Sequence, residues 1–258
     1  MENNQPYDLK SKKSITGNSS EYEIRFLFNI LSRSCLIRFA LFRDLPWIPS
    51  RFFALLVLGF FLTASISAGE TEMPRILFFG NSLTAGYGID PNFAFPALIQ
   101  EKINKEGLQL VAVNAGLSGE TSAGGFRRIN WLMKSRIDYF ILALGANDGL
   151  RGLSPEATAT NLQLIITAVR KRFQDIQIIV VGMKVPPNMG HRYKSQFEAI
   201  FARLAKKNNA VLLPFLLEGV AAIPKFNLPD GIHPNEEGHK IIAETVWNYL
   251  EPLIQTEL

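Results

Sequence analysis

The chain has 258 residues, 47% of them hydrophobic and 19% charged, and it carries a formal net charge of +4. Length and composition are those of a globular protein with enough apolar residues for a core, in one large or two small domains. Residues 1–68 hold 8 of the 27 basic and 5 of the 23 acidic side chains, so the remainder is nearly neutral. We therefore expect no nucleic-acid partner.

The first feature along the chain is an uncharged apolar segment, residues 52–68, which follows Arg43 and Arg51 and ends in small residues. These are the parts of an export signal, and we expect cleavage near Ala68 and an exported protein, periplasmic or secreted. The alternative is a membrane-anchored protein, attached through residues 52–68 of an uncleaved leader, although this segment is at the short limit for spanning a bilayer. Residues 1–51 form an atypical N-terminal extension with no assigned function, and residues 69–258 are predicted to be a single domain.

After Met73 the chain alternates short apolar runs with longer amphipathic ones. Near-continuous apolarity is typical of strands buried on both faces, and apolar residues at helical spacing indicate helices. The predicted strands are residues 75–80, 109–114, 138–144, 177–182 and 210–214. The predicted helices are residues 93–106, 122–134, 155–173, 192–207 and 236–250, and the last should end before Pro252.

This alternation predicts an α/β protein with right-handed crossovers. We expect a three-layer, flavodoxin-like fold in which a five-stranded parallel sheet carries helices on both faces. Ligands of such sheets bind beyond the carboxyl ends of the strands. Four glycine-bearing segments follow predicted strands and should form one site: residues 80–88, 114–125, 145–152 and 182–190.

Residues suited to nucleophilic catalysis lie at opposite ends of this pattern. Ser82 follows the first strand in a glycine-flanked turn, and Asp230-Gly-Ile-His233 precedes the last helix. A serine hydroxyl is a poor nucleophile unless a base takes its proton, and the base needs a group that orients it. The three side chains therefore predict a hydrolase.

Each of these segments is a weak signal alone, since a Gly-Asn-Ser turn, a capping Asp or a flexible Gly-rich connection occurs in many proteins. Together and in this order, they resemble the four sequence blocks of the SGNH, or GDSL-type, hydrolases: Gly80-Asn-Ser-Leu, Gly116, Gly145-Ala-Asn-Asp and Asp230-Gly-Ile-His. Residues 74–254 resemble in particular the bacterial thioesterase/protease/lysophospholipase group, often labelled arylesterases.

The resemblance implies that Ser82 is the nucleophile, His233 the general base and Asp230 the residue that orients the imidazole. It also implies an oxyanion hole made by the backbone N–H groups of Ser82 and Gly116 and by the Asn147 side chain. A helix N-terminus at Ser82 would favour negative charge, and Gly116, without a Cβ, would let its backbone approach the substrate.

One residue departs from the family pattern, because Asn81 stands where the family usually has Asp. Asn keeps the shape and an acceptor oxygen but loses a charge. If that position makes only local hydrogen bonds, activity is retained; if the charge matters, activity falls or its pH optimum moves.

Other polar residues near these blocks are given lesser roles. In the resembling group the loop that contains Met189 and His191 borders the substrate, so both are candidate substrate contacts, although His191 can also be an exposed loop residue. Asp148 is interpreted as a turn-stabilising residue and His239 as a surface residue of the last helix. Three histidines and a single cysteine, Cys35, which lies in the N-terminal part, predict no metal site, and we expect no cofactor.

The leading hypothesis is an exported serine esterase that acts on a small-molecule ester through an acyl-enzyme and functions as a monomer. Short or medium acyl esters, thioesters and lysophospholipids are candidate substrates. A carbohydrate deacetylase of the same family is one alternative. Another is a non-catalytic flavodoxin-like module that binds a phosphate or flavin at the turn after the first strand, in which the late Asp-x-x-His would have no role.

Overall fold

The computed structural model describes residues 73–256. The predicted leader and Cys35 lie outside these residues, so the export signal and the domain boundary near residue 69 stay predictions. Among residues 73–256, no helix has both the length and the apolarity that crossing a bilayer requires.

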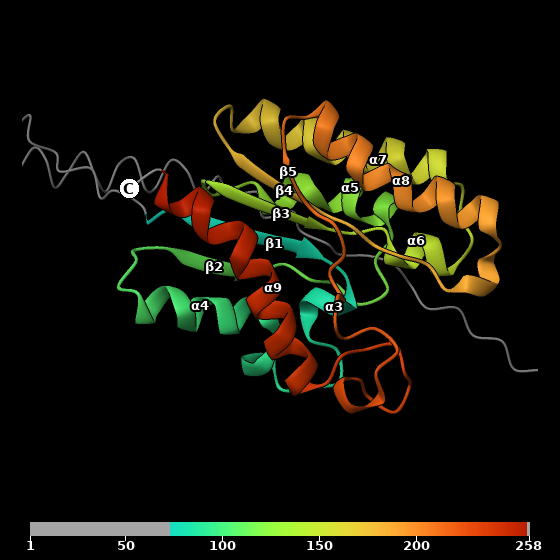
Figure 1. Cartoon of the computed structure of the whole chain (residues 1–258). Coiled ribbons are helices and arrows are strands. Elements are labelled where there is room, and N and C mark those ends of the chain that lie inside the picture. Colours follow the sequence, from blue (N-terminus) through green and yellow to red (C-terminus); the bar gives the residue numbers. More distant parts are fainter. Residues whose placement is uncertain (1–72, 257–258) are drawn as a thin grey trace, which may run out of the picture. The chain divides into compact units, whose positions relative to one another are not determined.

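A five-stranded parallel sheet in the order β2-β1-β3-β4-β5 lies at the centre of the fold (Figure 1). Its strands are β1 (Arg75–Gly80), β2 (Val111–Asn114), β3 (Tyr139–Ala143), β4 (Gln177–Val181) and β5 (Val211–Leu213). The α/β fold with a parallel sheet is thus confirmed. Burial on both faces holds for β1, β3 and β4, whereas β2 is only partly buried. The strands β2, β3 and β5 are each two residues shorter than predicted.

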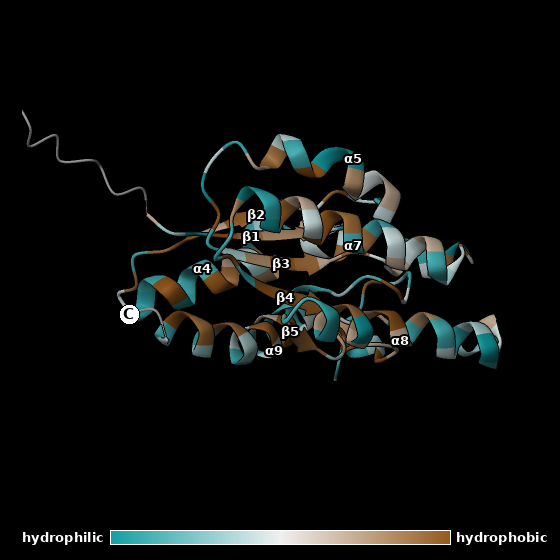
Figure 2. Ribbon diagram, turned by 90° about the horizontal axis from the view of Figure 1, so that it is seen from above, coloured by the Kyte–Doolittle hydropathy of each residue, from teal (hydrophilic) through white to brown (hydrophobic). Residues whose placement is uncertain are grey.

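Helices cover both faces of the sheet. They are α3 (Ser82–Ala85), α4 (Phe95–Lys105), α5 (Ser122–Leu132), α6 (Ala146–Leu150), α7 (Pro155–Arg172), α8 (His191–Lys207) and α9 (Glu236–Gln255), with 3-10 turns η1 (Pro91–Phe93), η2 (Pro187–Met189) and η3 (Pro224–Phe226). Contacts join α5 to α7 and α7 to α8 on one face, and α4 to α9 on the other; in Figure 1, α7 and α8 are at the top, and α9 crosses in front of β1 and β2. Figure 2 shows strands coloured as hydrophobic between helices whose outer residues are hydrophilic.

The last helix differs from its prediction, since α9 continues through Pro252 to Gln255. A proline inside a helix removes one backbone hydrogen bond and strains the preceding turn. Here Leu250 and Ile254 are both buried on the inner side of α9. Burial of Ile254 against the core offsets the missing bond, and the helix continues for one more turn.

The strand order creates a topological switch point between β1 and β3, at the carboxyl ends of the strands. The chain moves from β1 to β2 on one side and then crosses to β3 on the other, so the connections that leave β1 and β3 diverge. In open α/β sheets such a switch point, outside the carboxyl ends of the strands, is where ligands bind. Ser82 follows β1 directly, and Asn147 lies just beyond β3.

Candidate active site

Ser82 is placed by a single turn of helix at the end of β1. It is the first residue of α3, so its backbone N–H has no partner within that helix. Asn81 is the buried N-cap, and its side-chain oxygen accepts a hydrogen bond from the N–H of Leu83 at 3.0 Å. The contact of Asn81 is therefore a local cap, which Asn and Asp make about equally well.

His233 and Asp230 lie in the loop between η3 and α9. The Asp230 carboxylate accepts hydrogen bonds from the backbone N–H groups of Ile232 and His233, at 2.9 and 3.0 Å. Its other oxygen lies 2.7 Å from His233 Nδ1. These bonds to His233 and Ile232 lower the pKa of Asp230 to about 2. The side chain is therefore a carboxylate at any physiological pH, and it fixes the Nδ1–H tautomer of the imidazole.

The structure brings the predicted nucleophile and base together across 151 positions of the sequence. His233 Nε2 lies 3.0 Å from Ser82 Oγ. Because Asp230 holds the proton on Nδ1, Nε2 is the acceptor for the serine hydroxyl. The Tyr87 ring packs against the imidazole with ring centroids 4.6 Å apart. The imidazole is thus held between a carboxylate, a hydroxyl and an aromatic ring.

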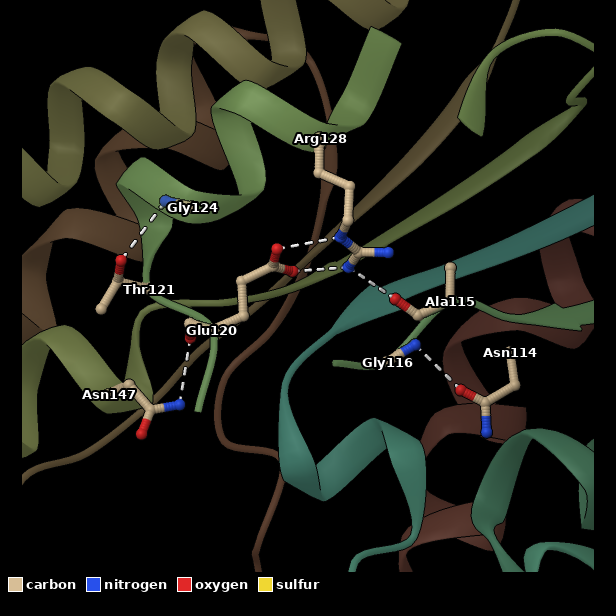
Figure 3. Close-up of polar contacts among 8 residues, drawn as sticks. All are labelled: Asn114, Ala115, Gly116, Glu120, Thr121, Gly124, Arg128 and Asn147. Atoms are coloured by element: carbon tan, nitrogen blue, oxygen red, sulfur yellow. Dashed lines mark hydrogen bonds and ion pairs between the residues drawn. The ribbon is translucent and has the colours of Figure 1, made fainter. Parts of the chain in front are cut away.

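Gly116 lies in a loop that is hydrogen-bonded to the end of β1. Ala115 N–H donates to the carbonyl of Phe78, and Leu117 N–H donates to the carbonyl of Gly80. A Cβ on Gly116 would lie 2.3 Å from the backbone nitrogen of Ala85. The backbone of α3 packs against this position and leaves no room for a Cβ, whereas the expected close approach of a substrate to Gly116 stays a prediction. Its N–H donates to Asn114 Oδ1 at 3.0 Å, so an oxyanion would have to displace that side chain (Figure 3).

Asn147 is in α6, a one-turn helix in a segment that was expected to be a loop. The helix begins after Gly145, whose φ of 114° is a conformation that glycine tolerates and other residues rarely adopt. Asn147 Nδ2 donates to the backbone carbonyl of Glu120 at 3.0 Å (Figure 3). An amide nitrogen has two hydrogens, so one orients the side chain and the second can bond a ligand.

Comparison with known proteins shows the family of this chain. Residues 78–241 match the model of the GDSL-like Lipase/Acylhydrolase family. The chain belongs to this family. The matched region contains all the residues placed in the site above.

The regions aligned with this chain cover most of the length of each relative. The chain is 36% identical over 194 residues to thioesterase 1/protease 1/lysophospholipase L1 of Escherichia coli strain K12, covering 75% of this chain and 89% of that protein. It is 34% identical over 186 residues to esterase TesA of Pseudomonas aeruginosa, covering 72% and 92%. The crystal structure of the psychrotrophic esterase EstA from Pseudoalteromonas sp., inhibited by monoethylphosphonate, has a TM-score of 0.67 at 29% identity, covering 70% and 98%.

Sequence reasoning missed a partly buried ion pair next to the site of this GDSL-like hydrolase. Arg128 of α5 binds Glu120 through two nitrogens. Asp148, which is also buried, accepts hydrogen bonds from the N–H and the hydroxyl of Ser122 at 2.8 and 2.6 Å. Asp148 is thus structural, but it joins α6 to α5 instead of stabilising its own turn. Glu120 and Arg128 are eight positions apart, one in a loop and the other in a helix. This spacing does not indicate a contact in the sequence.

Two candidate substrate contacts lie in and just after η2. Met189 ends this turn and is partly buried against the hydrophobic core. His191 is exposed and begins α8, so it is a helical residue instead of a loop residue. Their contact with a substrate stays a prediction.

The prediction that His239 is a surface residue is wrong. It is 1% exposed on the inner face of α9, and its Nδ1 accepts a hydrogen bond from Phe95 N–H at 3.1 Å. Burial lowers the pKa of His239 to about 4. Its spacing to Ile242, Ala243 and Val246 repeats every three or four residues, and this apolar period in the sequence could have revealed the buried position.

Proposed function

We propose that this protein is an esterase that hydrolyses acyl esters with Ser82 as nucleophile, His233 as general base and Asp230 as its orienting carboxylate. The observation that carries the proposal is the continuous chain of contacts, 3.0 Å from Ser82 Oγ to His233 Nε2 and 2.7 Å from Nδ1 to Asp230. Relatives named esterase and thioesterase support the same reaction class. A phosphate- or flavin-binding module would have no use for such a chain.

In the acylation step, His233 Nε2 takes the proton of Ser82 Oγ as the oxygen attacks the ester carbonyl. The C=O π electrons move to oxygen and give a tetrahedral oxyanion. His233 then returns its proton to the leaving alcohol as the ester bond breaks, which leaves an acyl-Ser82. Asp230 stabilises the imidazolium that forms in between.

In the deacylation step, water takes the place of the alcohol. His233 removes a proton from the water as it attacks the acyl carbonyl, and the proton goes back to Ser82 Oγ when the carboxylic acid leaves. The oxyanion of both steps would be bound by the N–H groups of Ser82 and Gly116 and by Asn147. Losing one such donor costs other enzymes about 10²–10³ in rate.

We further propose that the acyl group is apolar. Tyr87, Leu117 and Ile232 are large hydrophobic residues that remain exposed, and each is bonded in sequence to, or packed on, a residue of the site. Such residues suit the aliphatic part of short or medium acyl esters, including thioesters and lysophospholipids. A relative named both thioesterase and lysophospholipase supports this range.

The substitution Ser82→Ala tests the nucleophile. It should abolish turnover of p-nitrophenyl esters and leave the melting temperature nearly unchanged, because only one hydroxyl is lost. Ser195→Ala, on the exposed face of α8, is the matched control and should keep full activity. Full activity of Ser82→Ala would remove Ser82 from the mechanism.

A substrate screen with wild-type protein separates the related activities. Acyl esters of increasing length, an acyl thioester, a lysophospholipid and an acetylated sugar should be compared by kcat/KM. Preference for the acetylated sugar would favour the deacetylase alternative. Export through residues 52–68 is also proposed, and it is tested by fractionating cells that express the full chain and sequencing the N-terminus of the product.

A further inference from the structure

We propose that Arg128, paired with Glu120, is a positioning residue for the oxyanion hole. One guanidinium group is tied to the peptide that carries the Gly116 N–H and to the residue that orients Asn147. Two of the three oxyanion donors would therefore depend on a side chain that touches neither substrate nor nucleophile. The inference rests on the proposed esterase function.

The guanidinium lies between two parts of the β2–α5 loop (Figure 3). Arg128 Nε donates to one Glu120 carboxylate oxygen at 2.9 Å, and Nη2 donates to the other. The same Nη2 donates to the backbone carbonyl of Ala115 at 2.8 Å. Behind it, the Phe79 ring of β1 lies 4.8 Å from the guanidinium carbon. The planar guanidinium group is therefore held by a carboxylate, a backbone carbonyl and an aromatic ring.

The contact with Ala115 acts on the direction of the Gly116 N–H, together with the backbone bonds of Ala115 and Leu117 to β1. In this structure that N–H donates to Asn114 Oδ1, which an oxyanion would replace. The Ala115 carbonyl and the Gly116 N–H are the two ends of one peptide group. That group is planar and trans, so its N–H points opposite to its C=O. A hydrogen bond to the carbonyl oxygen thus helps to fix the donor direction, and the positive charge of Arg128 polarises the peptide so that its N–H is a stronger donor.

The contact with Glu120 acts on the second donor. The Glu120 backbone carbonyl accepts the hydrogen bond from Asn147 Nδ2, so the position of Glu120 sets the orientation of the Asn147 amide. The side chain of Glu120 is 3% exposed and that of Arg128 is 21% exposed, so the pair holds Glu120 within the loop. A Cβ on Gly124 would come within 3.2 Å of Glu120 Cγ, which shows how closely α5 packs on this residue.

Stability alone is a weak explanation for this pair. Removing two charges from water costs about as much as their attraction returns, and well-packed apolar residues often stabilise a buried site equally well. An ion pair gives what apolar residues lack, namely directional bonds to a chosen backbone oxygen. Arginine is suited to this task because its rigid fork can bind the carboxylate and the carbonyl together, whereas lysine offers a compact charge.

The test compares Arg128→Gln and Arg128→Lys with Arg136→Gln, a control that breaks the ion pair of Arg136 with Asp138. We measure kcat, KM, the melting temperature and the Ki of an acyl trifluoromethyl ketone, which forms a tetrahedral oxyanion on the serine. Arg128→Gln should lower kcat about 100-fold, with KM changed less than threefold. The inhibitor should lose affinity by a similar factor, because its oxyanion uses the same donors. The control should change none of these values by more than twofold.

Arg128→Lys separates positioning from charge balance. Lysine keeps a positive charge next to Glu120, so the melting temperature should stay within a few degrees of the wild-type value. It cannot reproduce the fork, so kcat and inhibitor affinity should each fall about 10-fold. This variant also keeps the test decisive if Arg128→Gln fails to fold.

Two outcomes would overturn the inference. One is a folded Arg128→Lys or Arg128→Gln variant with kcat and Ki within threefold of wild type. The other is a loss of activity that follows only the loss of folded protein, with Ki unchanged for the folded fraction. Ser82→Ala tells these outcomes apart from failure of the proposed function: if that variant is inactive while the Arg128 variants are normal, the esterase mechanism stands and the positioning role does not.

Discussion

At the scale of single residues, Asp230 receives three hydrogen bonds from its own loop and needs no distant partner to stay ionised. Two come from consecutive backbone N–H groups and the third from the His233 ring. A carboxylate that accepts several N–H bonds is stabilised in its charged form, and the pKa of Asp230 falls to about 2. The orienting group therefore does not titrate in the range where esters are assayed.

The low pKa of Asp230 leads to a prediction for the pH dependence of kcat/KM in acid. Between pH 4 and 6, Asp230 should add no step to the dependence of log kcat/KM on pH, because its carboxyl group is already ionised there. Stopped assays, in which the enzyme is exposed to acid for seconds, measure this without unfolding the protein. A slope approaching two would mean that a second group, such as Asp230, also titrates there and would contradict the low pKa of Asp230.

At the scale of elements, the sequence predicted what depends on local periodicity. Alternation of apolar runs and amphipathic segments was enough for the strands, the five longest helices and the parallel sheet. The one-turn helices α3 and α6 were read as turns, because four or five residues show no helical period. The Glu120–Arg128 pair and the Gly116–Asn114 bond were not foreseen either, since a loop folding back on a helix leaves no spacing in the sequence. The residues of the candidate triad could be predicted because residue types and their order along the chain are visible in the sequence itself.

The packing of Gly116 on α3 gives an element-scale prediction. In Gly116→Ala the new Cβ would meet Ala85 backbone atoms at 2.3 and 2.7 Å, and backbone cannot rotate away as a side chain can. Either the loop or α3 must move, and each carries a proposed catalytic group. We expect kcat to fall at least 100-fold, with a lower melting temperature, in a p-nitrophenyl ester assay and a thermal scan.

A second glycine provides the control for this substitution. Gly107, with a φ of 70°, has open space around its Cβ position, so Gly107→Ala introduces backbone strain without a clash. It should lower the melting temperature and leave kcat unchanged. If Gly116→Ala behaves like Gly107→Ala, the close contact with α3 has no bearing on catalysis.

At the scale of the whole molecule, His239 connects α9 to the start of α4. Its pKa falls from 6.5 to about 4 because of burial, so the folded protein holds it neutral while the unfolded chain binds a proton below about pH 6.5. The unfolded state then binds more protons, and the free energy of unfolding must rise with pH between about 4 and 6.5. The contribution is complete above pH 6.5 and is lost on acidification, by at most about 3.5 kcal/mol at roughly 1.4 kcal/mol per pKa unit.

Denaturant unfolding at pH 4.5, 5.5 and 7 checks this prediction. His239→Gln retains an acceptor for Phe95 N–H but has no group that titrates. The wild-type protein should lose more stability than the variant as the pH falls, and the difference should be negligible at pH 7 beyond the cost of the substitution itself. Equal pH dependence of the two proteins would show that protonation of His239 is unrelated to acid sensitivity.

The late position of His233 in the sequence has a consequence for the synthesis of the protein. Ser82 is synthesised early, whereas the imidazole proposed to activate it is added 151 residues later, in the loop that precedes α9. In the proposed mechanism, a nascent or prematurely terminated polypeptide that lacks His233 carries an unactivated alcohol. Esterase activity would therefore require synthesis of the chain through α9.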